Sequence, residues 1–313
     1  MSRRALFTHN DLDGLACALL ARFALGECDI WFCDYAGFPG LLSHNLHRYA
    51  AVWIADLSIK ADDPLMTTLQ AAEADILWFD HHASSDVQDW MTECRIDRSG
   101  TMCAADVISA YLAEQGLEVP APLQTLTEYT HDQDLWLRTR SEAQDFNDIL
   151  GHMQVQTLFD LLVADPLRIY QFTPAMEQAS RRTQSERQWS IELARRTSTV
   201  ADLPGGGQVK AACCWGSTSE VGEALGDGQT LVALMDLRGL ERGAVRFSFR
   251  TRSEEISASD LAALLGGGGH QKAAGAPLEV EILQVLTAEL ARRVAAAAQG
   301  ACAAQGACAA QGA

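Results

Sequence analysis

The chain has 313 residues and a mass of 33.9 kDa, and its 24 Lys and Arg against 41 Asp and Glu give a formal net charge of −17. This acidity excludes a broadly basic surface for long duplex DNA, because non-specific affinity for the phosphate backbone comes from Lys and Arg displacing counterions. A short anionic substrate held by a few local groups remains compatible with the charge. At about 150 residues per domain, the length indicates roughly two domains.

The N-terminal segment does not resemble a targeting sequence. Residues 1–10 contain Arg3 and Arg4 but only a short apolar run, too short for the apolar region of a signal peptide. Nine Cys without an export signal favour reduced thiols, and no Cys-x-x-Cys pair is present to suggest a zinc site. No apolar stretch is long enough to span a bilayer. We therefore expect a cytoplasmic protein with no membrane partner.

The first 90 residues alternate short apolar runs with helical stretches. The runs that predict buried strands cover residues 4–8, 29–33, 51–55 and 74–79. Residues 15–25 predict a helix that ends at Gly26. Such alternation is typical of a parallel sheet with helices on both faces, in which ligands bind beyond the carboxyl ends of the strands.

Helical patterns continue at residues 101–115 and 123–129, and a polar helix with five Arg runs from residue 176 to about residue 200. Beyond Pro204 the chain has strands of its own, then a glycine run and a terminal helix. We therefore predict an α/β fold in which a helical linker joins a parallel-sheet domain to a smaller α/β domain. The expected segments are residues 1–175 (metal-binding domain), 176–205 (linker), 206–294 (second domain) and 295–313 (low-complexity tail).

Acidic and imidazole side chains follow three of the predicted strands. His9, Asp11 and Asp13 alternate, so in an extended segment all three would project to one side. Asp56 and His81 follow neighbouring strands and would converge on the same edge. Carboxylates packed together repel unless cations neutralise them, so the pattern predicts a metal site. Mixed imidazole and carboxylate ligands favour manganese or another first-row divalent ion, and bridging carboxylates could hold two ions about 3.5–4 Å apart.

Each of these pieces also has a purely structural interpretation. Asp-x-Asp-Gly is commonly a turn with N-capping carboxylates, and Asp56 could cap a helix before Leu57. His-His pairs often occur by chance. Three strand ends of one predicted sheet carry such residues on the same edge, however, and this convergence favours a metal site.

The motifs at these strand ends resemble those of the DHH phosphoesterase superfamily. They are Thr-His-Asn-Asp-Leu-Asp-Gly at 8–14, Ile-Ala-Asp at 54–56 and Phe-Asp-His-His at 79–82. Asp132, in Asp-Gln-Asp-Leu-Trp, resembles the fourth motif. Residues 245–250 and the glycine-rich segment at 265–275 are similar to the DHH-associated C-terminal domain, so the resemblance extends to about residue 290.

The resemblance implies a metal centre and two catalytic groups. Its metal ligands would be His9, Asp11, Asp13, Asp56, His81 and Asp132, holding two manganese ions, with magnesium or cobalt as alternatives. His9 is the atypical member, because it precedes the first Asp by two residues where several branches have four. Asp134 competes with Asp132. Asp80 would orient the cluster, and His82 would face the scissile phosphate to stabilise its charge or protonate the leaving oxygen.

Candidates for substrate binding lie in the second half of the chain. A period of two puts Val245, Phe247 and Phe249 on one face of a strand and Arg246, Ser248, Arg250 and Arg252 on the other. Such a face is often merely solvated, and a glycine run is often a flexible turn. Successive backbone N–H groups in a glycine run can also bind an anion. Together with the resemblance, this gives as phosphate-binding candidates Ser248, Arg250, Gly268, Gly269 and His270.

These features predict a manganese-dependent phosphodiesterase similar to the oligoribonuclease (nanoRNase-like) branch. It would act as an exonuclease that releases mononucleotides, and its partners would be short single-stranded oligonucleotides or dinucleotides. A cyclic- or linear-dinucleotide phosphodiesterase is the first alternative, and a non-catalytic nucleotide-binding protein on the same scaffold is the second. A homodimer is compatible with the sequence.

Overall fold

The computed structural model describes residues 3–82, 84–203, 207–227, 230–242, 245–253, 256–269 and 271–277. It divides the chain into two units, Met1–Gln184 and Ser185–Ala313. His270, the expected terminal helix and the tail at 295–313 lie outside the described residues. The expected segment boundaries at 175, 205 and 294 stay predictions.

A parallel five-stranded sheet forms the centre of the first unit as described, with strand order β2-β1-β3-β4-β5. Its strands are β1 (Arg4–His9), β2 (Asp29–Cys33), β3 (Ala51–Ala55), β4 (Asp75–Asp80) and β5 (Glu93–Ile96). The first four coincide closely with the predicted strands. The fifth was not predicted, because its four half-buried residues include Glu93 and Arg95 and lack an apolar run.

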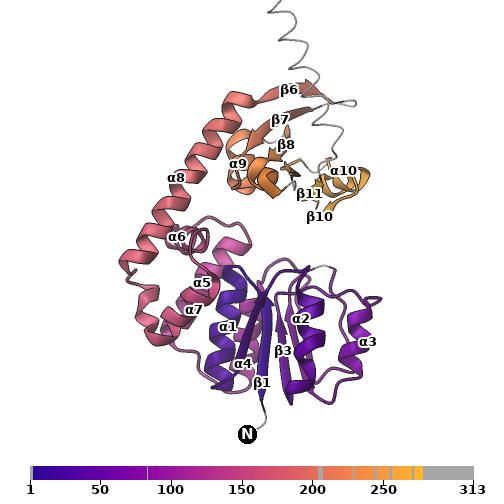
Figure 1. Cartoon of the computed structure of the whole chain (residues 1–313), viewed down its shortest axis with the longest axis vertical. Coiled ribbons are helices and arrows are strands. Elements are labelled where there is room, and N and C mark those ends of the chain that lie inside the picture. The colour runs from indigo at the N-terminus through magenta and orange to yellow at the C-terminus, as the bar shows by residue number, and fades with distance from the viewer. Residues whose placement is uncertain are drawn as a thin grey trace, which may run out of the picture. The chain divides into compact units, whose positions relative to one another are not determined.

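Helices cover both faces of this sheet (Figure 1). On one face lie α1 (Leu12–Leu25), α4 (Ala104–Glu114) and α5 (Ala121–Asp134), and on the other α2 (Phe38–Asn45) and α3 (Pro64–Gln70). Successive strand residues point to opposite faces, so the adjacent Trp78 and Phe79, both fully buried, belong to different cores. The prediction of an α/β fold with helices on both faces is confirmed.

Further helices follow the sheet. The core on the α1 face of the sheet also includes residues of α6 (Ser141–Leu150), α7 (Val155–Ala164) and the short η2 (Pro166–Ile169). The short η1 (Leu46–Arg48) belongs to the core on the α2 face. The predicted polar helix is α8 (Pro174–Thr197), which crosses the division between the two units. Among the residues described, none of the helices is both long and apolar enough to cross a membrane.

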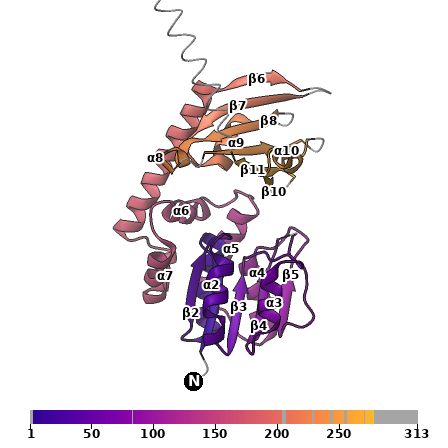
Figure 2. The same ribbon diagram turned by 45° about the vertical axis from the view of Figure 1, so that its right-hand side comes forward.

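The second unit contains a mixed sheet, with strand order β10-β11-β9-β8-β7-β6 in its described part (Figure 2). Only β7 and β8 pair in parallel among these described strands. The strands are β6 (Thr199–Asp202), β7 (Gln208–Cys214), β8 (Thr230–Asp236), β9 (Arg246–Thr251), β10 (Gly268–Gly269) and β11 (Ala273–Pro277). The helices between them are α9 (Thr218–Leu225), η3 (Leu237–Arg242) and α10 (Ala258–Leu264).

Small cores lie on both faces of the second sheet. Val221 of α9 and Ala194 of α8 pack with Val232 on one face. On the other face, Ala262 of α10 packs with Leu231. Leu231 and Val232 are consecutive in β8, so the alternation along this strand builds both cores.

Candidate active site

The candidate site lies at the carboxyl ends of β1, β3 and β4. The strand registers align Thr8 with Ala55 and Ala55 with Phe79, so the residues that follow them emerge at one edge of the sheet. This edge holds His9, Asp56, Asp80, His81 and His82, as the sequence predicts.

The extended arrangement expected for His9, Asp11 and Asp13 is wrong. Strand β1 ends at His9, Asp11 is the N-cap of α1, and Asp13 lies in the first helical turn. The Asp11 carboxylate accepts a hydrogen bond from Gly14 N at 3.0 Å. The capping preference of Asp therefore overrides the extended conformation. A Cβ at Gly14 would lie only 1.8 Å from the His9 carbonyl oxygen, so glycine lets the helix begin this close to the strand.

His81 lies among three carboxylates. Its Nε2 is 3.5 Å from Asp56 Oδ1 and 3.8 Å from Asp13 Oδ2, and its Nδ1 is 3.6 Å from Asp134 Oδ2. The backbone N–H groups of Ala104 and Ala105 hold Asp13 in place, at 2.7 and 2.8 Å. One potential ligand group is therefore Asp13, His81 and Asp134, whose ligand atoms lie within 4.8 Å of one another.

A second ligand group adjoins the first. His9 Nδ1 is 2.6 Å from Asp11 Oδ2 and 3.8 Å from Asp56 Oδ2, and the three ligand atoms of this group lie within 4.8 Å of one another. Asp56 thus directs Oδ1 toward His81 and Oδ2 toward His9. Asp56 therefore belongs to the second group and also lies close to His81 of the first, and a third potential group joins it to Asp80, His81 and His82.

Asp56 carries signs of a cation-binding residue. Its φ of +54° is in the left-handed region, which a non-glycine residue adopts at some cost and which is often found at functional sites. Its side chain is buried, and Oδ2 has no hydrogen-bond partner. A buried carboxylate oxygen without a hydrogen-bond donor is unfavourable unless a cation takes the place of the missing donor. The residues present therefore fit a divalent ion.

Burial and neighbouring charges shift the pKa values of the clustered carboxylates. Burial raises the pKa of Asp56 well above its usual value, and the charges of Asp11, Asp13 and Asp134 raise it further. Burial and repulsion from Asp134 and Asp11 do the same to the pKa of Asp13. Asp11 differs: burial raises its pKa, but the hydrogen bond and charge of His9 outweigh this and lower it. Without a bound cation, the carboxylates of the cluster repel one another.

The structure brings Asp134, and not Asp132, into the cluster. Both residues lie in α5, where positions two apart point in different directions. Asp132 is buried and accepts hydrogen bonds from Thr139 N at 2.8 Å, from Thr139 Oγ1 and from Arg140 N at 3.3 Å. Burial raises the pKa of Asp132, but the bonds from Thr139 outweigh it and lower the pKa. Asp132 therefore holds the turn before α6.

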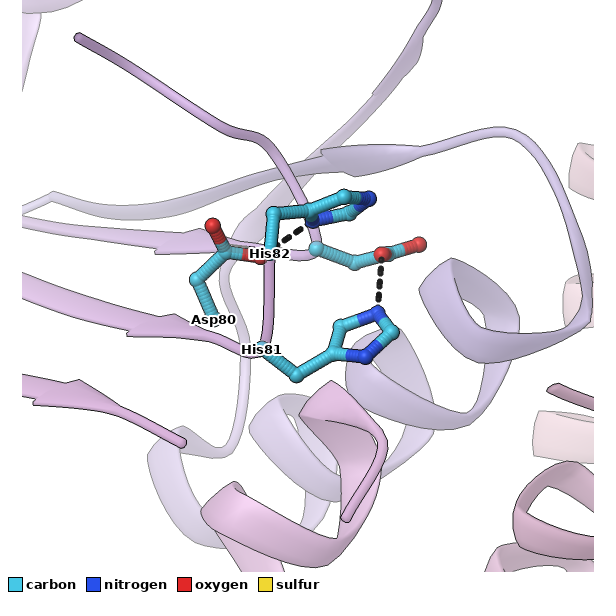
Figure 3. Close-up of side chains that lie close together, drawn as sticks. Asp80, His81 and His82 are labelled. Carbon is cyan, nitrogen blue, oxygen red and sulfur yellow. Dashed lines mark hydrogen bonds and ion pairs between the residues drawn. The ribbon is translucent and has the colours of Figure 1, made fainter. Parts of the chain in front are cut away.

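The ring of His82 lies beside that of His81, with centroids 4.6 Å apart, and pairs with Asp80 (Figure 3). Its Nδ1 donates to Asp80 Oδ1 at 2.7 Å, and Ser85 Oγ donates to the other oxygen of this fully buried carboxylate. Burial lowers the pKa of His82, but the hydrogen bond to Asp80 outweighs it and raises the pKa. Asp80 thus fixes the ring orientation and the protonated nitrogen.

Tyr35 was missed by the sequence analysis. Its hydroxyl lies 2.9 Å from His82 Nε2, and its ring centroid is 5.1 Å from that of His9. It follows β2, the strand whose end carries no metal-ligand motif. The position of Tyr35 just beyond the end of a predicted strand could have identified it as a candidate site residue.

The predicted phosphate-binding residues line a cavity of about 400 Å³ in the second unit. Four of the five candidates are found here, namely Ser248, Arg250, Gly268 and Gly269, while His270 is outside the described residues. Arg250 donates to Ser248 Oγ at 2.7 Å, and Thr218 Oγ1 and Ser219 Oγ accept from it at 3.2 and 3.1 Å. These bonds fix the guanidinium before any ligand arrives.

Two further Arg residues line this cavity. Arg246 and Arg238 join Arg250, and one acid, Asp236, pairs with Arg238 at 3.0 Å. The lining therefore carries more positive than negative charge and suits an anion. Arg238 was missed, although a polar residue just beyond the end of a predicted strand was a usable signal.

No family model matches the chain. The curated oligoribonuclease NrnB of Bacillus subtilis (strain 168) is 24% identical over 305 residues, which cover 92% of this chain and 76% of that protein. The pGpG-specific phosphodiesterase PggH from Vibrio cholerae has a similar structure, with a TM-score of 0.58 at 16% identity over 94% of this chain and 99% of that one. The DHH domain of a protein described as a member of a ribosomal-protein family gives a TM-score of 0.59 at 13% identity, over 94% and 86%.

These likenesses support the resemblance to the DHH phosphoesterase superfamily that the sequence motifs indicate. The two solved structures share the fold, and the sequence relative extends over nearly the whole chain. The Asp-His-His motif that carries the resemblance is Asp80, His81 and His82, at the end of β4.

Replacing Asp56 should separate metal binding from folding. Asn tolerates a positive φ, so Asp56→Asn should fold, and without metal its melting temperature should equal or exceed that of the wild type because a repelling charge is gone. Mn²⁺ at about 100 times its Kd should stabilise the wild type by about 2.7 kcal/mol and the variant far less. Thermal unfolding measures both. The exposed Asp160→Asn is the control, and an equal Mn²⁺ effect in Asp56→Asn would contradict the site.

Asp134 and Asp132 should respond differently to the same substitution. Asp134→Asn should raise the Mn²⁺ concentration for half-maximal stabilisation at least about 10-fold. Asp132→Asn should instead lower the free energy of unfolding by about 1–3 kcal/mol, because it weakens hydrogen bonds to Thr139 and Arg140. Thermal melts across a Mn²⁺ titration distinguish the two. The opposite pattern would make Asp132 the ligand.

Proposed function

We propose that this chain is a metal-dependent phosphodiesterase that hydrolyses short oligonucleotides and releases mononucleotides. The observation that carries the proposal is the buried Asp56 carboxylate, which belongs to one ligand group, lies close to His81 of the other and has an oxygen without a hydrogen-bond donor. The likeness to an oligoribonuclease over 92% of the chain supports the substrate class.

The proposed metal centre uses the two ligand groups. His9, Asp11 and Asp56 would hold one divalent ion, and Asp13, His81 and Asp134 the other, with Asp56 bridging and Asp134 replacing the Asp132 expected from the sequence. The mixture of imidazole and carboxylate favours Mn²⁺, with Mg²⁺ or Co²⁺ as alternatives. When bound, two such ions supply an activated water and neutralise phosphate charge.

His82 is the proposed proton donor. Asp80 keeps the proton on Nδ1 and raises the pKa of the ring, so a larger fraction of His82 is doubly protonated near neutral pH. Its Nε2 can then give a proton to the leaving oxygen. The Tyr35 hydroxyl contacts this nitrogen in the free protein, so the leaving oxygen must displace it.

The cavity of the second unit would bind a phosphate of the substrate. Arg250 is already held by three hydroxyl groups, and Arg238 and Arg246 add positive charge. A few local cations suit one or two phosphates, whereas long duplexes require an extended basic surface. This charge distribution favours short substrates.

A linear dinucleotide is the second candidate substrate, because PggH is specific for pGpG and its fold matches this chain over almost the full length of both. Product analysis distinguishes both substrate candidates from the cyclic-dinucleotide and non-catalytic hypotheses. Cytoplasmic location and a homodimer stay predictions.

Product analysis tests the proposed function. The purified chain with Mn²⁺ should release mononucleotides stepwise from end-labelled RNA of two to about twenty nucleotides, with a preference for the shortest. EDTA should stop the reaction, and His82→Ala and Asp80→Asn should each lower kcat by about 10²–10⁴-fold without loss of the fold. Cleavage of linear pGpG alone would move the chain to the dinucleotide class. No hydrolysis of RNA, pGpG or cyclic dinucleotides would refute the proposal.

Arg250 should contribute mainly to substrate binding. Arg250→Ala should raise the KM for a short RNA at least about 10-fold and change kcat less than about 3-fold, because the lost bond is made equally in the ground and transition states. Arg252→Ala is a matched control, since Arg252 is exposed on the same stretch, pairs with Glu223 at 3.0 Å and does not line the cavity. An unchanged KM in Arg250→Ala removes Arg250 from the site.

A further inference from the structure

Two tryptophan side chains are exposed side by side in the second unit. Trp189 of α8 is 53% exposed and Trp215, which follows β7, is 39% exposed. Their ring centroids are 6.1 Å apart and the rings are nearly perpendicular. Large aromatic side chains are usually well buried, so an exposed pair is a candidate contact surface.

Trp215 lies where an α/β sheet binds ligands. Strands β7 and β8 are parallel, and their register aligns Cys214 with Asp236, the last residue of each. Trp215 therefore emerges one residue beyond this last pair, at the carboxyl edge of the two parallel strands. Ligands of parallel sheets bind at this edge.

Gly216, the residue after Trp215, contacts two residues that line the cationic cavity. Gly216 N donates to Asp236 Oδ1 at 2.9 Å. The Arg238 guanidinium packs against the same glycine so closely that a Cβ there would lie 2.5 Å from Arg238 Cζ. Both Asp236 and Arg238 line the cavity, so the backbone that carries Trp215 is connected to the cavity lining through Gly216.

The backbone beneath the pair is held firmly. Ser190, fully buried and next to Trp189, accepts from Trp215 N at 2.9 Å and donates to Gly216 O at 3.0 Å. This hydroxyl ties α8 to the end of β7. The rings therefore project from a preorganised base, which reduces the entropy lost when a ligand stacks on them.

We propose that Trp189 and Trp215 form a base-stacking subsite for a short single-stranded oligonucleotide whose phosphate occupies the adjoining cavity. Aromatic rings beside cationic groups suit a nucleotide, because the base stacks on the ring while the phosphate pairs with Arg. The substrate class rests on the proposed function. The subsite adds a contact to the bases that does not depend on their sequence, since every base has a π-face.

Binding in EDTA tests the subsite without turnover. The Kd of a labelled five-nucleotide RNA is measured by fluorescence anisotropy for the full chain, and Trp189→Ala and Trp215→Ala should each raise it about 10-fold. Trp215→Phe should recover part of the loss because an aromatic face remains. Val200→Ala, which changes an equally exposed apolar residue on β6, should leave the Kd unchanged.

An abasic pentamer of the same charge separates stacking from electrostatics. It should bind the wild type and both Ala variants equally, because it has no bases to stack. Unchanged RNA binding in both Ala variants, or an equal loss with the abasic pentamer, would overturn the subsite. Hydrolysis is assayed separately with Mn²⁺, so loss of RNA binding in the Ala variants alongside an inactive wild type would uphold the subsite while refuting the proposed function.

Discussion

The buried carboxylate of Asp56 is the constraint on which the candidate site depends. Asp56 directly follows the central strand of the first sheet, β3, which has β1 on one side and β4 on the other. The parallel arrangement therefore places His9 and His81 on either side of it, one facing each carboxylate oxygen. Its left-handed backbone and unpaired Oδ2 are unfavourable in isolation, and the surrounding cores maintain them.

The fold also fixes the groups around Asp56 through backbone contacts. Asp11 caps α1, and the start of α4 donates two N–H groups to Asp13. These bonds orient carboxylates whose mutual repulsion would otherwise push them apart. Asp80 is held instead by a side-chain hydrogen bond from Ser85 Oγ and in turn orients His82. The repulsion between these acidic groups is thus built into the fold, and a bound cation would relieve it.

The sequence predicted those parts whose signal is local. Apolar runs identified four strands of the first sheet, and the motifs at their ends identified the edge where ligands gather. The prediction of an extended segment at Asp13 failed because two local preferences compete there. The alternation of side chains fits an extended chain, but Asp11 is a strong N-cap and Asp13 therefore lies in a helix. Likewise, the helical α5 turns Asp132 and Asp134 to different sides. Tyr35 and its partner His82 are 47 residues apart, a pairing that only the tertiary fold reveals.

The most direct test of a two-metal centre is to count the ions. Equilibrium dialysis of the full chain against Mn²⁺, followed by elemental analysis and electron paramagnetic resonance, should give two ions per chain and the spin coupling expected of bridged neighbours. EDTA should remove both ions. A chain that retains no Mn²⁺ at millimolar concentration, or that binds one isolated ion with no coupling, would contradict a centre built around Asp56.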